Sequence, residues 1–389
     1  MPRTAFLLFL VILFLGGCSS SPLTPTANAP APVIDPTRTP TASQTPDQTP
    51  LPFTPSPVPS RTPTSQPTEA NRPTSSPTSV PDTTLLFTGV IVPARCVQAK
   101  LDELGNPDYP YEEVREIIAD ADLAVGVLNA TMSDYPPPTG CVSTYVLVGS
   151  SNNADALAGA GFDVMSVATN HIKDCGITTC GDRAFFDTME NLDRVGIQRV
   201  GAGGNLAEAL QPLVVEVNGV RFGFVSLGDS RQGDWTFAGE ESPGIAFLNE
   251  ENMRQAIAAA REVSDVVIAL PHWGPEDVSV PNGIQQRQAR YIVDAGADLV
   301  VGNHTHVVQG IQEIDGITVF YGLGNFVFDQ STRDHQQGVI LQVRFSGSEF
   351  IEHELIPTHV DMDGRVHIAD PQEAAEILDR INQASKTLR

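Results

Sequence analysis

Residues 299–306 read LVVGNHTH, a short apolar run followed almost at once by two histidines, His304 and His306. A short apolar run that ends at glycine and asparagine predicts a buried β-strand at 299–302. In open α/β sheets, side chains that follow the carboxyl ends of neighbouring strands converge on one crevice. This stretch therefore predicts both a buried sheet and a functional site at the edge of that sheet.

The same pattern recurs at two other predicted strands. Asn170 and His171 follow the apolar run 162–168, and His272 follows the run 265–271. A single histidine at such a place is more often a hydrogen-bonded structural residue, but four of them at strand ends favour a common site. Neutral imidazoles and the amide oxygen of Asn170 suit a divalent zinc, manganese or iron ion. The other four histidines lie in polar surroundings and are expected at the surface: His335, His353, His359 and His367.

Helix and strand patterns alternate along most of the chain. Apolar periodicity predicts helices at 112–121, 152–160, 182–195, 250–263, 284–295 and 371–384. Strands are predicted at 85–92, 123–128, 162–168, 214–217, 220–227, 265–271, 299–302, 310–314, 317–321, 338–345 and 350–356. Asn218 and Gly219, between two of these strands, predict a type I′ hairpin. Alternating units followed by antiparallel strands predict an α/β fold in which packed sheets are flanked by helices.

The N-terminus has the features of a secretory signal. Arg3 precedes an apolar run at 5–15, which is too short for a comfortable membrane span. The run ends in Leu15-Gly16-Gly17-Cys18, which resembles a bacterial lipobox. We therefore expect a signal peptide at 1–17, lipidation of Cys18, and a protein anchored on the extracytoplasmic face of a bacterial membrane. The alternative is a freely secreted protein in which Cys18 has no such role.

The segment 18–82 is predicted to be a disordered tether. It holds 17 of the 31 prolines among many Thr and Ser residues, and too little apolar surface to offset the entropy of ordering. Its charges and those of residues 1–17 cancel, so the net charge of −24 belongs to one folded domain at 83–389. Such an acidic domain repels phosphate backbones, which argues against nucleic acid as a partner.

Four cysteines fall in the predicted domain: Cys96, Cys141, Cys175 and Cys180. An even number in an exported protein predicts two disulfides. Of the three possible pairings we favour Cys175–Cys180 with Cys96–Cys141, because a short loop separates the first pair. The spacing of Cys175 and Cys180 also occurs in zinc sites, but the sequence has no second pair with zinc-finger spacing.

Four short motifs together resemble the CapA family, which is named for poly-γ-glutamate capsule synthesis and is a branch of the calcineurin-like metallophosphoesterases. The motifs are Gly-Asn-His-Thr-His-Val-Val-Gln at 302–309, Asn170-His171 with Asp174, His272-Trp273-Gly274 with Glu276, and Gly-Leu-Gly-Asn-Phe-Val-Phe-Asp at 322–329. They occur in the family's order, and the resemblance runs from about residue 85 to 345. It implies a four-layer α/β/β/α sandwich of the metallo-dependent phosphatase type, with metal at the strand ends.

The resemblance also implies roles for individual residues. Asn170, His272 and His304 would bind one metal ion, and His306 would face a second. The catalytic set implied by the motifs is His171, Asp174 and Arg95. In it, His171 would sit beside the substrate and stabilise a developing oxyanion. Arg95 would bind an anionic substrate, unless it forms a surface salt bridge.

The chain departs from the family pattern at two acidic metal ligands. The aspartate that ends the family's first strand is Val90 here, and the glutamate of its second motif is Asn129. A dinuclear site needs anionic oxygens to offset the charge of two cations and to bridge them. Without them the site would hold one divalent ion or none, unless Asp134, Asp174 or Glu276 substitutes.

Two classes of function follow from this departure. In the first, an envelope lipoprotein with a partly degenerate metal centre acts in the synthesis or anchoring of a capsule polymer, and its partner is that polymer or a small anionic ligand. In the second, the domain is an active metal-dependent phosphoesterase or related hydrolase outside the cytoplasm. Chemistry on peptide or amide bonds is a third reading.

Overall fold

A computed structural model describes residues 81–175, 179–230 and 233–388. The predicted signal peptide at 1–17, Cys18, and the predicted tether as far as residue 80 lie outside these ranges. Within the described part of the chain, no helix is long and apolar enough to cross a membrane.

The first sheet has eight strands and is built around β1 (Asp82–Ile91). On one side of β1 lie the parallel strands β2 (Leu123–Leu128), β5 (Val164–Ser166) and β6 (Gln198–Val200). On the other side lie the antiparallel strands β16 (Gln337–Ser346), β17 (Glu349–Val360) and β18 (Val366–Ile368). The short strand β15 (Asn325–Val327) runs parallel to the end of β1.

The second sheet has six strands, in the order β13 (Ile311–Ile314), β14 (Ile317–Phe320), β12 (Leu299–Val301), β11 (Val266–His272), β9 (Val220–Gly228) and β8 (Leu213–Val217). Strands β14, β12, β11 and β9 are parallel, so their carboxyl ends share one edge. Asn218 and Gly219 join β8 to β9 with φ angles of 52° and 81°, the left-handed pair that a type I′ turn requires. Two small ladders complete the strands, β3 (Thr131–Met132) with β4 (Val148–Gly149) and β7 (Ala202–Gly203) with β10 (Gly244–Ile245).

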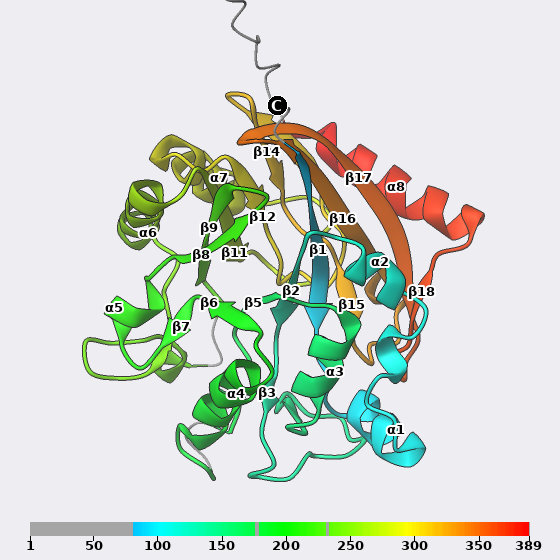
Figure 1. Ribbon diagram of the computed structural model, residues 1–389. Coiled ribbons are helices and arrows are strands. Elements are labelled where there is room, and N and C mark those ends of the chain that lie inside the picture. Colours follow the sequence, from blue (N-terminus) through cyan, green and yellow to red (C-terminus); the bar gives the residue numbers. More distant parts are fainter. Residues whose placement is uncertain (1–80, 176–178, 231–232, 389) are drawn as a thin grey trace, which may run out of the picture. The chain divides into compact units, whose positions relative to one another are not determined.

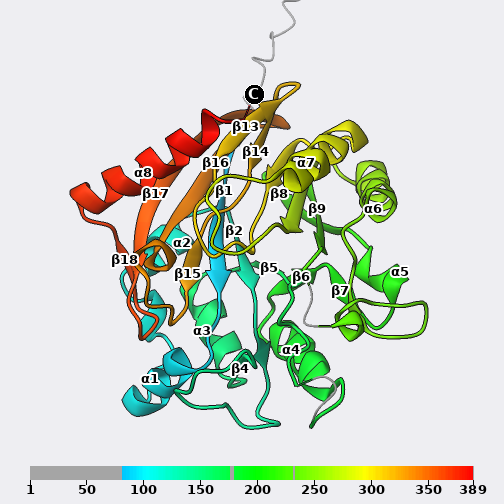
Figure 2. The same ribbon diagram turned by 180° about the vertical axis from the view of Figure 1, so that it is seen from behind.

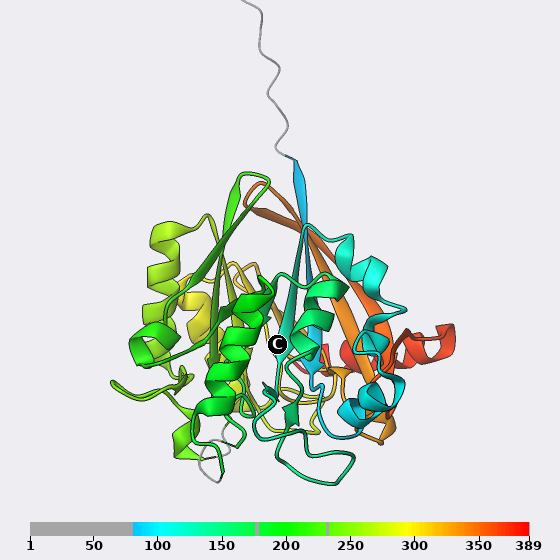
Figure 3. The same cartoon turned by 60° about the horizontal axis from the view of Figure 1, so that its bottom comes forward.

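Helices cover the outer face of each sheet. The first sheet is covered by α1 (Cys96–Leu104), α2 (Arg115–Ala119), α3 (Asn153–Ala160) and α4 (Arg183–Arg194). The second sheet is covered by α5 (Leu206–Ala209), α6 (Glu250–Val263) and α7 (Gly283–Ala295). Three short 3-10 helices lie in connections, η1 (Tyr109–Tyr111), η2 (Asp234–Thr236) and η3 (Arg333–Gln336). The yellow-green helices α6 and α7 and the cyan helices α1 and α2 lie on opposite sides of the strands (Figures 1 and 3).

A continuous apolar core lies between the two sheets. It joins Phe87 and Val125 of the first sheet to Phe222, Phe224 and Ile268 of the second, all of them buried. Two further clusters pack each sheet against its own helices. The layers are therefore helices, sheet, sheet, helices. The predicted α/β/β/α sandwich is confirmed.

The last helix, α8 (Pro371–Ser385), runs along β17 (Figures 1 and 2). Its buried Ile377 and Ile381 enter the core between the sheets. Asp370 caps its N-terminus by accepting hydrogen bonds from the backbone N–H groups of Gln372 and Glu373, at 2.8 and 3.0 Å. Helix α8 thus closes one side of the sandwich by contacts with both sheets.

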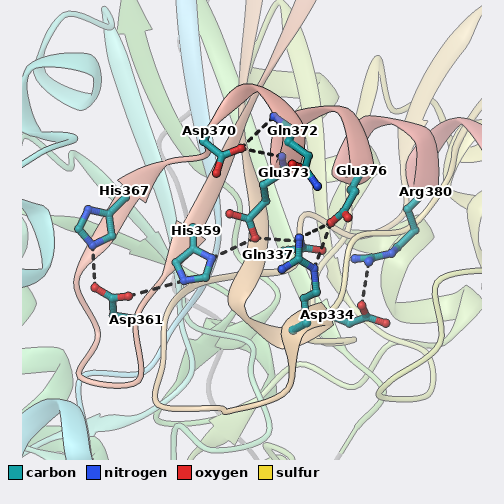
Figure 4. Close-up of polar contacts among 11 residues, drawn as sticks. Asp334, Gln337, His359, Asp361, His367, Asp370, Gln372, Glu373, Glu376 and Arg380 are labelled. Carbon is teal, nitrogen blue, oxygen red and sulfur yellow. Dashed lines mark hydrogen bonds and ion pairs between the residues drawn. The ribbon is translucent and has the colours of Figure 1, made fainter.

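Two of the histidines expected at the surface lie in a chain of polar groups beside α8 (Figure 4). The carboxylate of Asp361 lies between their rings, 2.7 Å from Nε2 of His367 and 3.6 Å from Nε2 of His359. Nδ1 of His359 is 3.1 Å from Glu373, whose carboxylate also accepts from Gln337 at 2.8 Å. Both rings are partly exposed. His359 joins the end of β17 to Glu373 of α8, and His367 joins Asp361 to Glu113, from which its Nδ1 is 2.8 Å away.

Most predicted elements are present, and the differences lie in short segments. The predicted helix at 112–121 is reduced to the single turn and a half of α2, preceded by η1. Helix α1 and the strands β15 and β18 were not predicted. α1 and β15 are held by contacts with distant parts of the chain, the disulfide to Cys141 and the pairing with β1, and β18 has only three residues, which form a hairpin with β17.

The cysteine prediction is half right. Cys96 and Cys141 form the expected disulfide, across 45 residues. Cys175 and Cys180 are free thiols, so the second predicted disulfide is wrong for this structure. The thiol of Cys180 donates to the backbone carbonyl of Cys175 at 2.8 Å, and Sγ of Cys175 lies 2.7 Å from the hydroxyl of Thr179. Closeness in sequence brought the two residues together as free thiols, and burial together with the hydrogen bond to the Cys175 side chain raises the pKa of Cys180 to about 11.

Candidate functional site

Three of the predicted metal ligands meet at the carboxyl ends of the parallel strands. His272 is the last residue of β11, Asn170 follows β5 of the other sheet, and His304 follows β12. Nε2 of His272 lies 3.0 Å from Oδ1 of Asn170 and 3.2 Å from Nδ1 of His304. Donor atoms that share one ion at ~2.1 Å are separated by ~3.0–3.4 Å, so Nε2 of His272 has the spacing of a ligand that shares an ion with each of the other two atoms.

His306 joins the same edge because the backbone turns sharply there. His304 and His306 both have positive φ angles, 104° and 60°, which L-residues rarely adopt. The turn brings their ring centroids to 6.1 Å. Nδ1 of His306 lies 2.8 Å from Oδ1 of Asn325 in β15, and its ring packs beside Phe328 at 5.3 Å. His306 is therefore next to the group of three without direct contact to His272.

The protein holds these imidazoles in the neutral form. All three rings are at most 4% exposed. Burial lowers the pKa of His304 to about 3 and that of His306 to about 4, with further lowering by the charge of His171. Burial likewise lowers the pKa of His272 well below the ordinary value of 6.5. Neutral imidazoles keep a lone pair at neutral pH, which is what a metal requires.

His171 and Asp174 form a buried pair. Nδ1 of His171 lies 2.8 Å from Oδ2 of Asp174, and the same oxygen accepts from the backbone N–H of Leu147 at 2.5 Å. Burial raises the pKa of Asp174, while its hydrogen bond to His171 acts in the opposite direction. The backbone N–H of His171 donates to Oδ1 of Asn129 at 3.2 Å. The structure thus places the predicted His171 and Asp174 together, with Asp174 orienting the ring.

Arg95 is occupied by contacts within the protein. Its guanidinium forms an ion pair with the buried Asp329, with Nε 3.1 Å from each carboxylate oxygen. It also donates from Nη1 to the carbonyl of Thr144 at 2.9 Å and lies 4.9 Å from the ring centre of Phe328. The backbone N–H of Cys96 donates to the same carboxylate at 3.0 Å. Arg95 therefore ties three segments together, and a role in binding an anionic substrate stays a prediction.

The two replaced acidic positions have different surroundings. Val90 is fully buried in an apolar cluster whose other members are Val92, Ala94, Ala130, Leu147 and Phe328. Asn129 is also buried, and its Nδ2 has no hydrogen-bond partner among the described residues. Nδ1 of His272 is likewise without a partner in this part of the chain. Val90, at the position of the family's aspartate, is therefore surrounded by apolar side chains, one of which, Phe328, lies beside His306.

Several polar residues at the site were not singled out from the sequence. They are Asp229 and Ser230 after β9, Asp277 in the loop after β11, Asn325 in β15, and His335 in η3. Oγ of Ser230 lies 2.7 Å from Nε2 of His304, and Nε2 of His335 lies 2.5 Å from Oδ1 of Asp277. The ring of His335 is only 15% exposed, which departs from the surface position expected for it. Asp229 and Ser230 could have been found from the sequence, because they directly follow the end of the strand β9, as the predicted ligands follow theirs.

The three carboxylates that were expected to replace the lost acidic ligands lie outside the cluster of Asn170, His272 and His304. Glu276 comes nearest, with Oε1 4.0 Å from Nε2 of His304. Asp174 is bound to His171 and Leu147, and Asp134 accepts hydrogen bonds from Ser150 and Ser151. Across residues 81–175, 179–230 and 233–388, no three His, Cys, Asp or Glu side chains are arranged to hold a metal ion. The candidate centre therefore depends on the amide oxygen of Asn170.

Comparison with known proteins identifies the same family as the four short motifs do. Residues 84–330 match the family model described as bacterial capsule synthesis protein PGA_cap. The chain is 29% identical over 286 residues to the PGA biosynthesis protein CapA of Bacillus subtilis, covering 71% of this chain and 73% of that protein. It is 27% identical over 286 residues to the capsule biosynthesis protein CapA of Bacillus anthracis, covering 71% and 67%.

Similar solved structures are more distant. A phosphatase of Mycoplasma pneumoniae has a TM-score of 0.43 at 14% identity, covering 76% of this chain and 97% of that chain. A putative 5′-nucleotidase of Staphylococcus aureus has a TM-score of 0.44 at 13% identity, covering 78% and 58%. The assignment of this chain rests on the sequence match and on its own two sheets.

Proposed function

The chain belongs to the bacterial capsule synthesis protein PGA_cap family, and from that premise we propose that it acts in the synthesis or anchoring of a poly-γ-glutamate-like capsule polymer outside the cytoplasm. Its similarity to two Bacillus CapA proteins over about seven tenths of the chain supports this role. The polymer, or a small anionic ligand, is the proposed partner.

We propose further that the domain binds one divalent ion through Asn170, His272 and His304. The observation that carries this proposal is the spacing of 3.0 and 3.2 Å from Nε2 of His272 to the other two donor atoms. The ligand set fits zinc, manganese or iron, because it combines neutral nitrogens with an amide oxygen. A bound cation would supply positive charge and Lewis acidity for an anionic group of the ligand.

The proposed centre is partly degenerate. Its candidate ligands are neutral, and the nearest carboxylate, Glu276, lies 4.0 Å from His304. The apolar cluster around Val90 offers no oxygen to a second ion beside His306. Because two adjacent cations need anionic oxygens between them, these residues support one ion and disfavour a dinuclear centre.

An active phosphoesterase is the alternative function, and the pair of His171 and Asp174 favours it. Asp174 holds the ring of His171 in a fixed orientation at 2.8 Å, and His171 lies close enough to lower the pKa of His304 and His306 by its charge. An imidazole so placed can stabilise an oxyanion or transfer a proton. This alternative requires the hydrolysis to proceed without the acidic groups at positions 90 and 129.

One set of measurements separates the two functions. The full chain is loaded with zinc or manganese, its metal content is measured by elemental analysis, and hydrolysis of a generic phosphodiester is assayed. We expect about one ion per chain, none in His272→Ala, and an unchanged content in the control His353→Ala, whose ring is exposed on β17. Metal-dependent turnover that His272→Ala abolishes would favour the phosphoesterase. Equal metal contents in wild type and His272→Ala would contradict the proposed centre.

Membrane anchoring through Cys18 is part of the same proposal. The support is the sequence Leu15-Gly16-Gly17-Cys18 after a short apolar run. Cells that express the full chain should incorporate labelled fatty acid into it, and Cys18→Ser should remove the label and release the protein from the membrane fraction. Release of the wild-type protein without label would contradict anchoring.

A further inference from the structure

The strand β8 is an open edge of the second sheet. It is the last strand in the sheet order, and within the described part of the chain it pairs only with β9. An open edge has a row of backbone N–H and C=O groups that can pair with another chain, so proteins usually block it with lysine, proline, a bulge or a covering helix. At the opposite edge, β13 has such a cover, because α8 packs against it and the hydroxyl of Ser385 accepts from the backbone N–H of Ile311 at 2.7 Å. Helix α8 and β8 lie at opposite sides of the strands, so α8 does not reach β8 (Figures 1 and 2).

The residues of β8 read Leu-Val-Val-Glu-Val at 213–217. None of the five is lysine or proline, and the pairing with β9 runs without a bulge. Leu213, Val215 and Val217 pack against the core between the sheets, but all three are only partly buried. The edge therefore combines unpaired backbone groups with apolar side chains that remain in contact with water, and burying both would favour association.

The pairing with β9 decides which backbone groups of β8 face outward. Val217 and Val220 flank the two-residue turn, and in such a hairpin the flanking residues form a hydrogen-bonded pair. The pattern alternates along an antiparallel pair, so Val215 also directs its backbone groups to β9. Val214 and Glu216 lie between these positions and direct theirs to the open edge.

A second copy of the same strand fits this edge in one register. When two copies run antiparallel about Val215, Val214 of each copy lies opposite Glu216 of the other, and each such pair can exchange two backbone hydrogen bonds. A register centred on Glu216 would set two like charges directly opposite each other, which destabilises a sheet. A register centred on Val214 would place Glu216 opposite Pro212, which has no backbone N–H to donate. The register about Val215 avoids both problems.

We infer that β8 is an interface between two copies of this chain, in which the two strands pair antiparallel about Val215 and join two six-stranded sheets into one. In that arrangement Leu213 lies opposite Val217 of the second copy, so the partly buried apolar side chains cover one another. The formal charge of −24 on each chain opposes the approach of two copies, and the association therefore strengthens as salt screens that repulsion. The interface uses no residue of the candidate metal centre.

Sedimentation of the full chain in detergent measures the oligomeric state. We expect a dimer whose fraction rises from ~0.01 M to ~0.15 M salt, since the screening length falls from ~30 to ~8 Å. Val214→Pro removes an outward N–H and leaves the pairing with β9 in place, because proline is tolerated where the N–H faces away from the sheet, so this variant should be monomeric. The control Val214→Thr keeps both the N–H and a branched side chain and should still dimerise. A monomeric wild type at both salt concentrations, or a dimer that persists in Val214→Pro, would overturn the inference.

Cross-linking tests the register itself. In Val215→Cys the two cysteines would lie directly opposite in a non-hydrogen-bonded pair, with Cα atoms ~4.5 Å apart, within the ~4.4–6.8 Å of a disulfide. In the control Val217→Cys they would lie four positions apart along the strands, at least ~13 Å, which a disulfide cannot span.

Mild oxidation of cells that express these full-length variants should therefore give a disulfide-linked dimer in Val215→Cys, above the level in wild type, and none above that level in Val217→Cys. Equal amounts of dimer in the two variants, no dimer in either, or a product with a different protein would overturn the inference. This measurement does not require Val214→Pro to fold.

Discussion

The amide oxygen of Asn170 lies 3.0 Å from Nε2 of His272, although 102 positions separate the two residues in the chain. Asn170 lies in the turn after β5 of the first sheet and His272 is the last residue of β11 in the second, so this contact spans the two halves of the sandwich. The candidate centre is therefore held together by the packing of the sheets. Disturbing that packing should alter metal binding even where no ligand is changed.

Restoring the missing acidic ligand should increase the metal content. Val90 is fully buried in an apolar cluster and is paired with Asn325 of β15. In Val90→Asp, an unpaired carboxylate in this place costs several kcal/mol without a cation. We expect lower stability in the metal-free variant, recovery on addition of zinc or manganese, and more than one ion per chain by elemental analysis.

The control for that variant is Val90→Asn, which has a similar shape and no charge. It should lose stability without gaining metal. An unchanged metal content in Val90→Asp would count against the placement of residue 90 beside the candidate centre.

The metal-free protein should lose stability in mild acid. Burial lowers the pKa of His306 to about 4 and that of His304 to about 3, from the ordinary 6.5. Between the lowered pKa values of the folded chain and the ordinary 6.5 of the unfolded chain, the unfolded chain binds more protons than the folded chain. The free energy of unfolding therefore rises with pH in this range. The stability from these two groups is complete above pH 6.5, and we expect it to fall by at least ~3 kcal/mol as the pH falls to 4.

Urea unfolding of the chelator-treated full chain at a series of pH values measures this slope. His306→Gln removes one of the titrating rings and should make the slope smaller. Equal slopes in the variant and the wild type would show that the acid sensitivity arises elsewhere.

Arg95 should matter for stability, whatever its role toward a ligand. It forms an ion pair with Asp329, whose side chain is 3% exposed, while that of Arg95 is 16% exposed. Removing one member of such a pair leaves the other poorly compensated, so Arg95→Ala should cost about 3 kcal/mol. The matched control is Arg194→Ala at an exposed pair with Asp155, where about 0–1 kcal/mol is expected. Unfolding free energies that are equal for the two variants would argue against the structural role.

The disulfide between Cys96 and Cys141 should stabilise the domain. It closes a loop across 45 residues, which reduces the entropy of the unfolded chain by the equivalent of about 4 kcal/mol. We expect Cys96→Ser with Cys141→Ser to lower the midpoint of denaturant unfolding. Cys175→Ser with Cys180→Ser should have a smaller effect, because these thiols are free. A reducing agent that leaves the wild-type midpoint unchanged would contradict this prediction.

Long periodic segments could be predicted from the sequence, and short segments could not. The predicted bounds of β2 (Leu123–Leu128) and α6 (Glu250–Val263) agree with the structure, because both have strong local apolar patterns. β15 (Asn325–Val327) was missed, since three residues carry little periodicity and its pairing with β1 is non-local. Asn325 belongs to the family motif at 322–329, but its contact with His306 could not be predicted, because the position of β15 depends on that non-local pairing.

The order of the longer elements, the family motifs, and the positions of Asn170, His272 and His304 at strand ends could be inferred from the amino-acid sequence, because these depend on local pattern and residue type. Which atoms meet is a property of the folded chain. The fold places Ser230 against His304 across 74 positions, pairs Arg95 with Asp329, and leaves Cys175 and Cys180 as free thiols. Such contacts depend on how two sheets pack and where the chain turns, and neither is recorded in the local succession of residues.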